Sequence, residues 1–221
     1  WEPCTIAEIK SYKPENNSIC SGQVLQCPYT FEKTRIVIRE MAEMMALDLV
    51  DKEIVTDQLI LTVGYDIENL SDPQISKNYK GEITIDRYGR SIPKHAHGTQ
   101  NLSEFTNSTY EIIENTLNLY DRIMNPDLLI RRITLTANHV KKEQDIVKKE
   151  TYEQLNLFTD YAVVEKEKQE KEEKLQKEKK LQHAMLEIKK KYGKNAILKG
   201  TNFEEGATSI DRNQRIGGHK A

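Results

Sequence analysis

Cationic and hydroxyl side chains recur along the stretches that this sequence predicts to be extended. Arg131-Arg132 lie near the start of the last such stretch and Lys141-Lys142 follow it, while further basic residues lie earlier. Phosphate oxygens accept hydrogen bonds from Arg, Lys, Ser and Thr, so such a surface suits a nucleic-acid backbone. An ordinary polar sheet face is the alternative. The candidate residues are Arg87, Arg90, Lys94, His95, His97, Thr99, Arg131, Arg132, Thr134, Lys141 and Lys142.

Other chemistries find weaker support in the residue spacing. His95 and His97 lack a third ligand at a usable distance along the chain, so we expect no metal site there. The cysteines Cys4, Cys20 and Cys27 are odd in number and form no CxxC pair, which predicts reduced thiols in a cytoplasmic protein. The sequence contains neither a glycine-rich phosphate loop nor a convincing nucleophile and base. We therefore expect no catalytic residue, metal or cofactor in this chain.

A short apolar peptide stands out in an otherwise polar segment. Gln154, Leu155, Leu157 and Phe158 form the pattern Gln-Leu-x-Leu-Phe. Leucines and a phenylalanine in a linker indicate a partner surface that receives them, with the glutamine hydrogen-bonded at its rim. The alternative is a helical turn that packs on its own domain. We interpret the peptide as a docking motif.

Hydrophobic periodicity predicts the elements that must position these residues. Leu59, Leu61 and Val63 alternate with polar residues, as in a half-buried strand, whereas Met41 and Met45 recur at helical spacing. The predicted strands are 18–25, 58–65, 83–85, 97–105 and 129–138, and the predicted helices are 30–51 and 108–124, with turns at 27–29 and 88–89.

Two amphipathic helices can cover only one face of this sheet. The second begins with the capping-box spacing Ser108-Thr109-Tyr110-Glu111. The last strand alternates, with Ile133 and Leu135 expected inward and Arg132 and Thr134 outward. We predict a two-layer α+β fold with a mainly antiparallel sheet, two helices on one face and an open, polar second face.

The net charge of −2 averages two unlike parts of the 221-residue chain. Residues 1–150 carry a net charge of −5 and residues 151–221 one of +3. The acidic residues of the first part fall largely on the predicted helices, so its sheet can still face an anion. Lys and Glu dominate 165–180, which predicts a solvated charged helix, and the Gly- and Asn-rich stretch 200–221 predicts a loosely held tail. No apolar run approaches the ~18 residues of a membrane span.

Several segments resemble the C-terminal part of Y-family translesion DNA polymerases. Residues 21–25 (Ser-Gly-Gln-Val-Leu), 97–102 (His-Gly-Thr-Gln-Asn-Leu) and 130–135 (Ile-Arg-Arg-Ile-Thr-Leu) look like their little-finger domain. Glu2-Pro3-Cys4 resembles the end of the thumb before it. Residues 86–90, 190–200 and 216–221 are similar to the C-termini of the UmuC-like (ImpB/MucB/SamB) branch.

This resemblance implies that the sheet grips damaged primer-template DNA and that Gln154–Phe158 docks on the ring-shaped β sliding clamp of bacteria. It also implies DNA repair in the SOS response, with a UmuD-like subunit as a further candidate partner. The family's catalytic carboxylates and their Mg²⁺ belong to the palm, whose motifs have no counterpart here. We therefore interpret the chain, which opens at Trp1 without Met, as a non-catalytic piece of a longer polymerase. The acidic domain and the length of residues 66–94 depart from the family pattern.

The resemblance also divides the chain into five segments. They are the end of the thumb with a linker (1–17), the little finger (18–140), a linker with the clamp-binding peptide (141–163), the charged helix (164–193) and the C-terminal tail (194–221).

A second hypothesis is that the chain is a protein-interaction module, which tethers a repair enzyme to the clamp and binds little DNA itself. Titrating DNA and the clamp separately distinguishes the two hypotheses.

Overall fold

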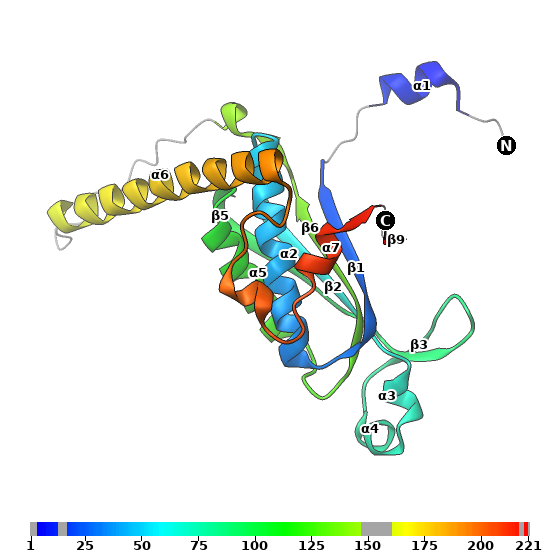
Figure 1. Ribbon diagram of the computed structural model, residues 1–221. Helices are drawn as coiled ribbons and strands as arrows, with labels where there is room; N and C mark the ends of the chain where they lie inside the picture. The colour runs from blue at the N-terminus through cyan, green and yellow to red at the C-terminus, as the bar shows by residue number, and fades with distance from the viewer. Residues whose placement is uncertain (1–3, 13–16, 147–160, 217–218, 221) are drawn as a thin grey trace.

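The computed structural model describes residues 4–12, 17–146, 161–216 and 219–220. Its centre is an antiparallel sheet in the order β1-β6-β2-β5, with α2 and α5 packed on one face (Figure 1). The predicted two-layer α+β fold is confirmed. The elements of this body are β1 (Ile19–Tyr29), α2 (Phe31–Asp51), β2 (Ile54–Tyr65), β5 (Ala96–Thr106), α5 (Thr109–Ile123), β6 (Ile130–Asn138) and β7 (Lys141–Lys142), which pairs with the start of β2.

The core lies between the sheet and the two helices. Alternate residues of β2 and β6 are fully buried, as their period of two predicts. The Tyr120 ring stacks on Phe31 at 4.7 Å between centroids, and its hydroxyl donates to the Phe31 carbonyl at 2.9 Å. Burial raises the pKa of the Tyr120 hydroxyl. The inward residues of the two central strands are Leu59, Leu61, Val63, Ile133, Leu135 and Ala137.

Side-chain caps fix where both helices begin. The Thr30 hydroxyl accepts from the Lys33 amide at the start of α2, and the Ser108 hydroxyl accepts from the Glu111 amide at the start of α5. The two predicted helix starts are therefore confirmed. The predicted turn at 27–29 is wrong, because β1 continues to Tyr29. β1 is an edge strand whose pairing with β6 shifts register after Val24, so Pro28 interrupts no ladder hydrogen bond.

The segment between β2 and β5 forms a separate lobe at one end of the sheet. It contains α3 (Glu68–Ser71), α4 (Pro73–Asn78) and a hairpin of β3 (Ile83–Ile85) and β4 (Ser91–Pro93). Buried Asn69 ties the lobe to the sheet, since its side chain accepts from the Leu129 amide at 2.7 Å and donates to the Leu129 carbonyl at 2.8 Å. The hairpin turns at Gly89, where φ is +79°, as the sequence predicted.

The C-terminal part of the chain packs on the helix layer. The second half of α6 (Tyr161–Tyr192) crosses the ends of α2 and α5, while its first half projects away (Figure 1). The chain then returns along α2, where buried hydrogen bonds hold Ser209. The prediction of a loosely held tail is therefore wrong for the described residues around Ser209. The remaining elements are α1 (Ile6–Ser11), which buries no residue, and η1 (Glu143–Asp145), η2 (Gly200–Phe203), α7 (Ser209–Asn213), β8 (Arg215–Ile216) and β9 (His219–Lys220). In the described part of the chain, no helix has the length and apolarity that crossing a bilayer requires.

Candidate nucleic-acid interface

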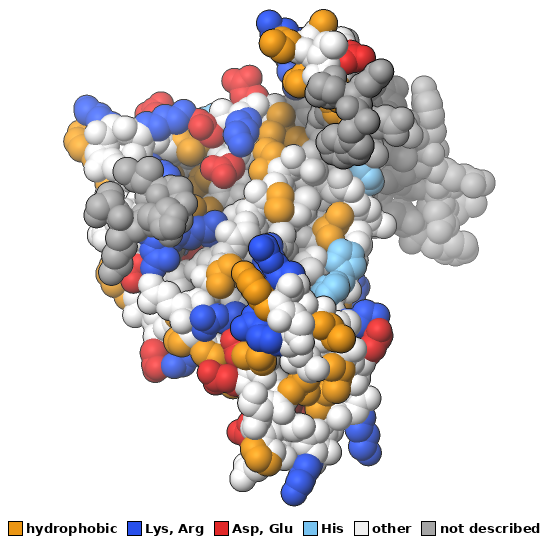
Figure 2. Space-filling view, turned by 90° about the vertical axis from the view of Figure 1, so that its right-hand side faces the viewer, with side chains coloured by type: hydrophobic (Ala, Val, Ile, Leu, Met, Phe, Trp, Pro, Cys, Tyr) orange, Lys and Arg blue, Asp and Glu red, His pale blue; other side chains and the backbone are white. Residues whose placement is uncertain are grey.

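The face of the sheet opposite the helices forms one polar surface, which we call the open face. Register aligns its residues in rows, such as Gly22, Thr134, Thr62 and His97 across all four strands. Figure 2 looks onto this face, where white atoms prevail, orange, blue and pale-blue side chains lie among them, and red ones lie mainly toward the margins. The open face comprises Cys20, Gly22, Val24, Gln58, Ile60, Thr62, Gly64, His97, Thr99, Asn101, Arg132, Thr134, Thr136 and Asn138.

Hydrogen bonds hold several of these side chains in place. Asn138 Nδ2 donates to Gln58 Oε1 at 2.7 Å, and Gln58 Nε2 donates to Asn101 Oδ1 at 2.8 Å, which links three strands. The Thr62 hydroxyl lies 2.9 Å from His97 Nδ1. The open face thus presents preordered neutral hydrogen-bonding groups, and none of its residues is acidic. The predicted site residues did not include Gln58, Asn101 and Asn138, although the alternation along their strands placed them outward.

Arg131 and Arg132 have different environments despite being adjacent. Arg132 is exposed on the open face beside Gly64, where an added Cβ would meet the Arg132 Cβ at 3.4 Å. Arg131 lies in the bulge between the paired residues Ile130 and Arg132. Its Nη1 donates to the Gln26 carbonyl at 3.0 Å, and its Nε lies 3.7 Å from the buried Asp66 carboxylate. Arg132 is therefore available to a ligand, while Arg131 is engaged within the fold.

The β3–β4 hairpin carries two further candidates. Arg87 and Arg90 both lie 5.1 Å from the centroid of the Tyr88 ring. Arg90 also forms an ion pair with Asp86 at 2.6 Å, and hydrogen bonds from Arg90 hold the pKa of the Asp86 carboxyl below its ordinary value. Arg87 has no carboxylate partner among the described residues. Arg87 is therefore the less compensated charge of this hairpin.

The other candidates lie on both sides of this arrangement. Lys94 pairs with Glu82 at 2.7 Å, and His95 is exposed next to it. Thr99 and Thr134 lie on the open face with His97.

Lys142 pairs with Ile54 and Lys141 with Val55 at the start of β2, whereas Arg132 pairs with Gly64. The lysines therefore lie nine to ten residues, or about 30–33 Å, from Arg132 along the strand. Adjacent strand residues point to opposite faces: Lys142 lines a hollow with Val50 and Glu53 at the end of α2, while Lys141 lies 4.6 Å from the centroid of the Phe105 ring. The structure thus divides the predicted basic strip, with Arg132 and the hairpin at one end of the sheet and Lys141 at the other.

Several carboxylates lie on the opposite layer. Glu32, Glu40, Glu43 and Asp48 belong to α2, behind the sheet, and Glu111 belongs to α5. The open face itself contributes no carboxylate, although residues 1–150 are net acidic and Asp86, Glu82 and Glu143 lie next to candidate cations.

Two other sequence predictions concern a docking peptide and a metal site. Gln154, Leu155, Leu157 and Phe158 lie outside the described residues. Within the ranges that the structure describes, no group of three or more His, Cys, Asp or Glu residues could hold a metal ion.

Comparison with known proteins identifies the central part of the chain. A family model described as the impB/mucB/samB family C-terminal domain matches residues 16–157. This range includes every strand of the main sheet and both of its covering helices. No curated protein matches the chain significantly.

Proposed function

Since this chain belongs to the impB/mucB/samB family, the UmuC-like branch of the Y-family polymerases, we propose that its open face grips primer-template DNA. The observation that carries the proposal is the set of preordered neutral groups beside exposed Arg132, on a face that contributes no carboxylate of its own. The family supplies the context of DNA damage repair, and the open face supplies a surface suited to phosphates.

The arrangement suits a duplex bound by its backbone. Arg132 with the hairpin at one end and Lys141 at the other are separated by close to one helical turn of B-DNA, so they can contact phosphates about one turn apart. Such contacts read no sequence. A repair polymerase that meets many sequences and damaged bases needs a grip of this kind.

The test compares DNA binding after the loss of two cations that have no carboxylate partner among the described residues, Arg87 and Arg132, with binding after the loss of Arg35, which is ion-paired on the helix side. Arg87→Ala with Arg132→Ala should weaken binding to a labelled primer-template roughly tenfold and lower the salt dependence of log Kd by about two. Arg35→Ala is the matched control, because Arg35 pairs with Asp121 on the helix layer at 3.0 Å. Fluorescence anisotropy between 50 and 200 mM salt measures both quantities. Equal Kd values and slopes for the double variant and wild type would contradict the proposal.

We further propose that Gln154–Phe158 docks this region on the β sliding clamp. Its support is the residue pattern, with Leu157 and Phe158 as apolar anchors and Gln154 as the polar contact. Leu157→Ala with Phe158→Ala should abolish capture by immobilised clamp, whereas Asn156→Ala at the variable position should not. Retained capture by the double variant would exclude this docking mode.

We infer that the chain does not polymerise nucleotides on its own. The resemblance implies that the acidic residues that bind the catalytic Mg²⁺ lie in a palm domain, whereas the family model that matches this chain is that of a C-terminal domain. A primer-extension assay of the isolated chain should give no product, and extension above background would overturn this inference. A UmuD-like subunit remains a candidate partner by the same resemblance, and co-purification tests it.

A further inference from the structure

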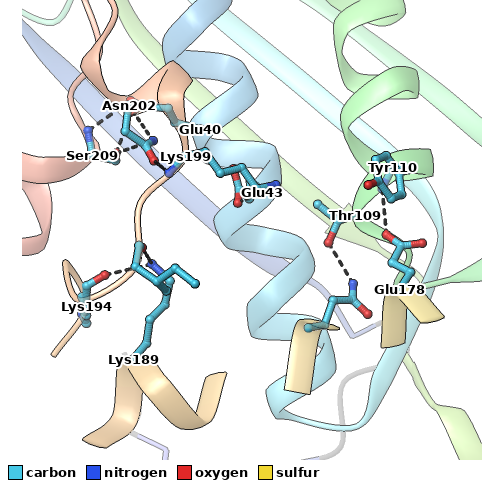
Figure 3. Close-up of polar contacts among 12 residues, drawn as sticks. Glu40, Glu43, Thr109, Tyr110, Glu178, Lys189, Lys194, Lys199, Asn202 and Ser209 are labelled. Carbon is cyan, nitrogen blue, oxygen red and sulfur yellow. Dashed lines mark hydrogen bonds and ion pairs between the residues drawn. The ribbon is translucent and has the colours of Figure 1, made fainter. Parts of the chain in front are cut away.

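The C-terminal tail is anchored to α2 by one buried carboxylate. Glu40 is only 4% exposed and accepts hydrogen bonds from the Thr208 amide at 2.8 Å and the Ser209 amide at 3.0 Å. The Ser209 hydroxyl donates to it at 2.7 Å and Asn202 Nδ2 at 2.8 Å. Figure 3 shows Asn202 and Ser209 of the returning chain gathered at this helix. A buried carboxylate is stable only with such partners, so this contact fixes the position of the tail.

A second contact ties the tail to the edge of the sheet. Arg212 of α7 donates to the Ser21 hydroxyl at 3.0 Å and to Gln23 Oε1 at 3.2 Å, both on β1. Gln23 in turn donates to the Thr208 hydroxyl at 2.9 Å. The acceptors of Arg212 are neutral, and burial lowers the pKa of its guanidinium. Within the described ranges, Arg212 forms no ion pair, so its charge is not compensated by a direct carboxylate contact.

The tail and β1 enclose a hollow of about 640 Å³. Residues 22–26 of β1 form one wall, and Lys194, Arg212 and Arg215 of the C-terminal part line the other, with Asp211 as the acidic member. The Nε atom of Arg215 is buried and has no hydrogen-bond partner among the described residues. No described group bonds Lys194 Nζ. The hollow therefore holds three cations to one carboxylate, with buried donor capacity unused.

This hollow lies at the β1 edge and shares two residues with the open face. Gly22 and Val24 line it and also belong to the open face, where Val24 is 62% exposed. A phosphate group offers several oxygens to guanidinium and ammonium donors, and Arg matches its geometry well. A duplex on the open face can place one phosphate chain along the β1 edge, beside the hollow.

We propose that the hollow binds a DNA backbone phosphate, so that the C-terminal tail forms part of the DNA interface. This inference rests on the proposed function. The tail then has two tasks: Glu40 and Arg212 hold it in place, and Lys194 and Arg215 contact the ligand.

The experiment uses the full chain with Lys194→Gln and Arg215→Gln together. Neither residue takes part in the hydrogen bonds of Glu40 or Arg212, so the tail should stay docked. Lys174→Gln with Lys180→Gln is the control, since it removes the same charge from exposed positions of α6. The hollow variant should bind primer-template several-fold more weakly than the control, with a salt slope lower by about one for each lost phosphate contact.

Several results would overturn the inference. Equal affinity and slope in the hollow variant and the control would exclude the DNA contact, while DNA binding by wild type would leave the proposed function intact. Inorganic phosphate is the second probe: if it raised the Tm of wild type but not of the hollow variant, and DNA binding did not differ, the site would serve a free phosphate compound instead. Failure of wild type itself to bind DNA would contradict the proposed function, and the phosphate titration would still test the hollow.

Discussion

The two sides of the sheet differ in how their charges are compensated. On the helix side, charged groups pair within the chain: Arg35 with Asp121 at 3.0 Å, and Lys199 with Glu43 at 2.9 Å. On the open face, Arg132 has no carboxylate partner among the described residues, and the neighbouring groups are neutral. A net charge near zero therefore says little about this protein, because some cations pair within the chain, whereas Arg132 on the open face and Lys194 and Arg215 beside the tail have no carboxylate partner among the described residues.

The largest effect on stability is expected at Glu40, because its buried carboxylate accepts hydrogen bonds that hold the tail on the helix side. Glu40→Ala leaves the amides of Thr208 and Ser209 without their acceptor, so we expect a loss of about 2–3 kcal/mol in the free energy of unfolding. Urea denaturation measures the loss, and hydrogen exchange of the Ser209 amide reports release of the tail.

The control for this prediction lies on the same helix. Glu32→Ala removes an exposed carboxylate in the first turn of α2 and should cost less than about 1 kcal/mol. Equal stability of the two variants would mean that the tail contributes nothing to the fold.

Two glycines, one on each face of the sheet, test how tightly each face is covered. At Gly98 an added Cβ would lie 2.7 Å from Ile123 Cγ2 and 2.9 Å from Leu119 Cδ1, because α5 covers this face. Gly98→Ala should therefore destabilise the fold by about 1–3 kcal/mol. Gly22→Ala on the open face meets nothing closer than 3.8 Å and should change stability little. Thermal unfolding compares them, and a neutral Gly98→Ala would show that α5 packs more loosely than described.

Local patterns predicted the sheet and its faces well. Alternation placed Leu61 and Leu135 inward and Thr62 and Thr134 outward, since a period of two needs no knowledge of distant partners. The docked tail was missed for the opposite reason. Its Gly- and Asn-rich composition indicates a loop, and nothing nearby in the sequence shows that its polar groups meet Glu40.

The interface was only partly predictable for similar physical reasons. The sequence presents Arg131 and Arg132 as one basic pair, but a bulge turns them toward different surroundings. Likewise, the residue types of Lys94 and Arg90 suit phosphate, yet each has a carboxylate partner whose position depends on how the hairpin closes. Charge alone therefore identifies candidates, and pairing decides which of them remain available.

Substituting the adjacent arginines one at a time should have a smaller effect on stability and should show which of them is available to DNA. Arg131→Ala removes the hydrogen bond to the Gln26 carbonyl and the cation beside buried Asp66, so we expect a loss of about 1 kcal/mol in stability. Arg132→Ala should change stability by less than about 0.5 kcal/mol while weakening DNA binding. Measuring unfolding and DNA affinity for both variants separates the roles. A reversed pattern, with Arg132→Ala the destabilising change, would contradict the assignment.

The smallest expected effect is a change in the pKa of the Asp86 carboxyl in the hairpin. Hydrogen bonds from Arg90 to the carboxylate lower the pKa of Asp86, so its titration by NMR should fall below the ordinary value near 3.9. Because the folded pKa is the lower one, this contact stabilises the hairpin above about pH 4, and the stabilisation is lost as the pH falls through the folded pKa. Arg90→Gln should bring the titration back toward the ordinary value. If Asp86 titrated identically in both proteins, Arg90 would not be held by Asp86, and the hairpin would offer two available arginines to DNA instead of one.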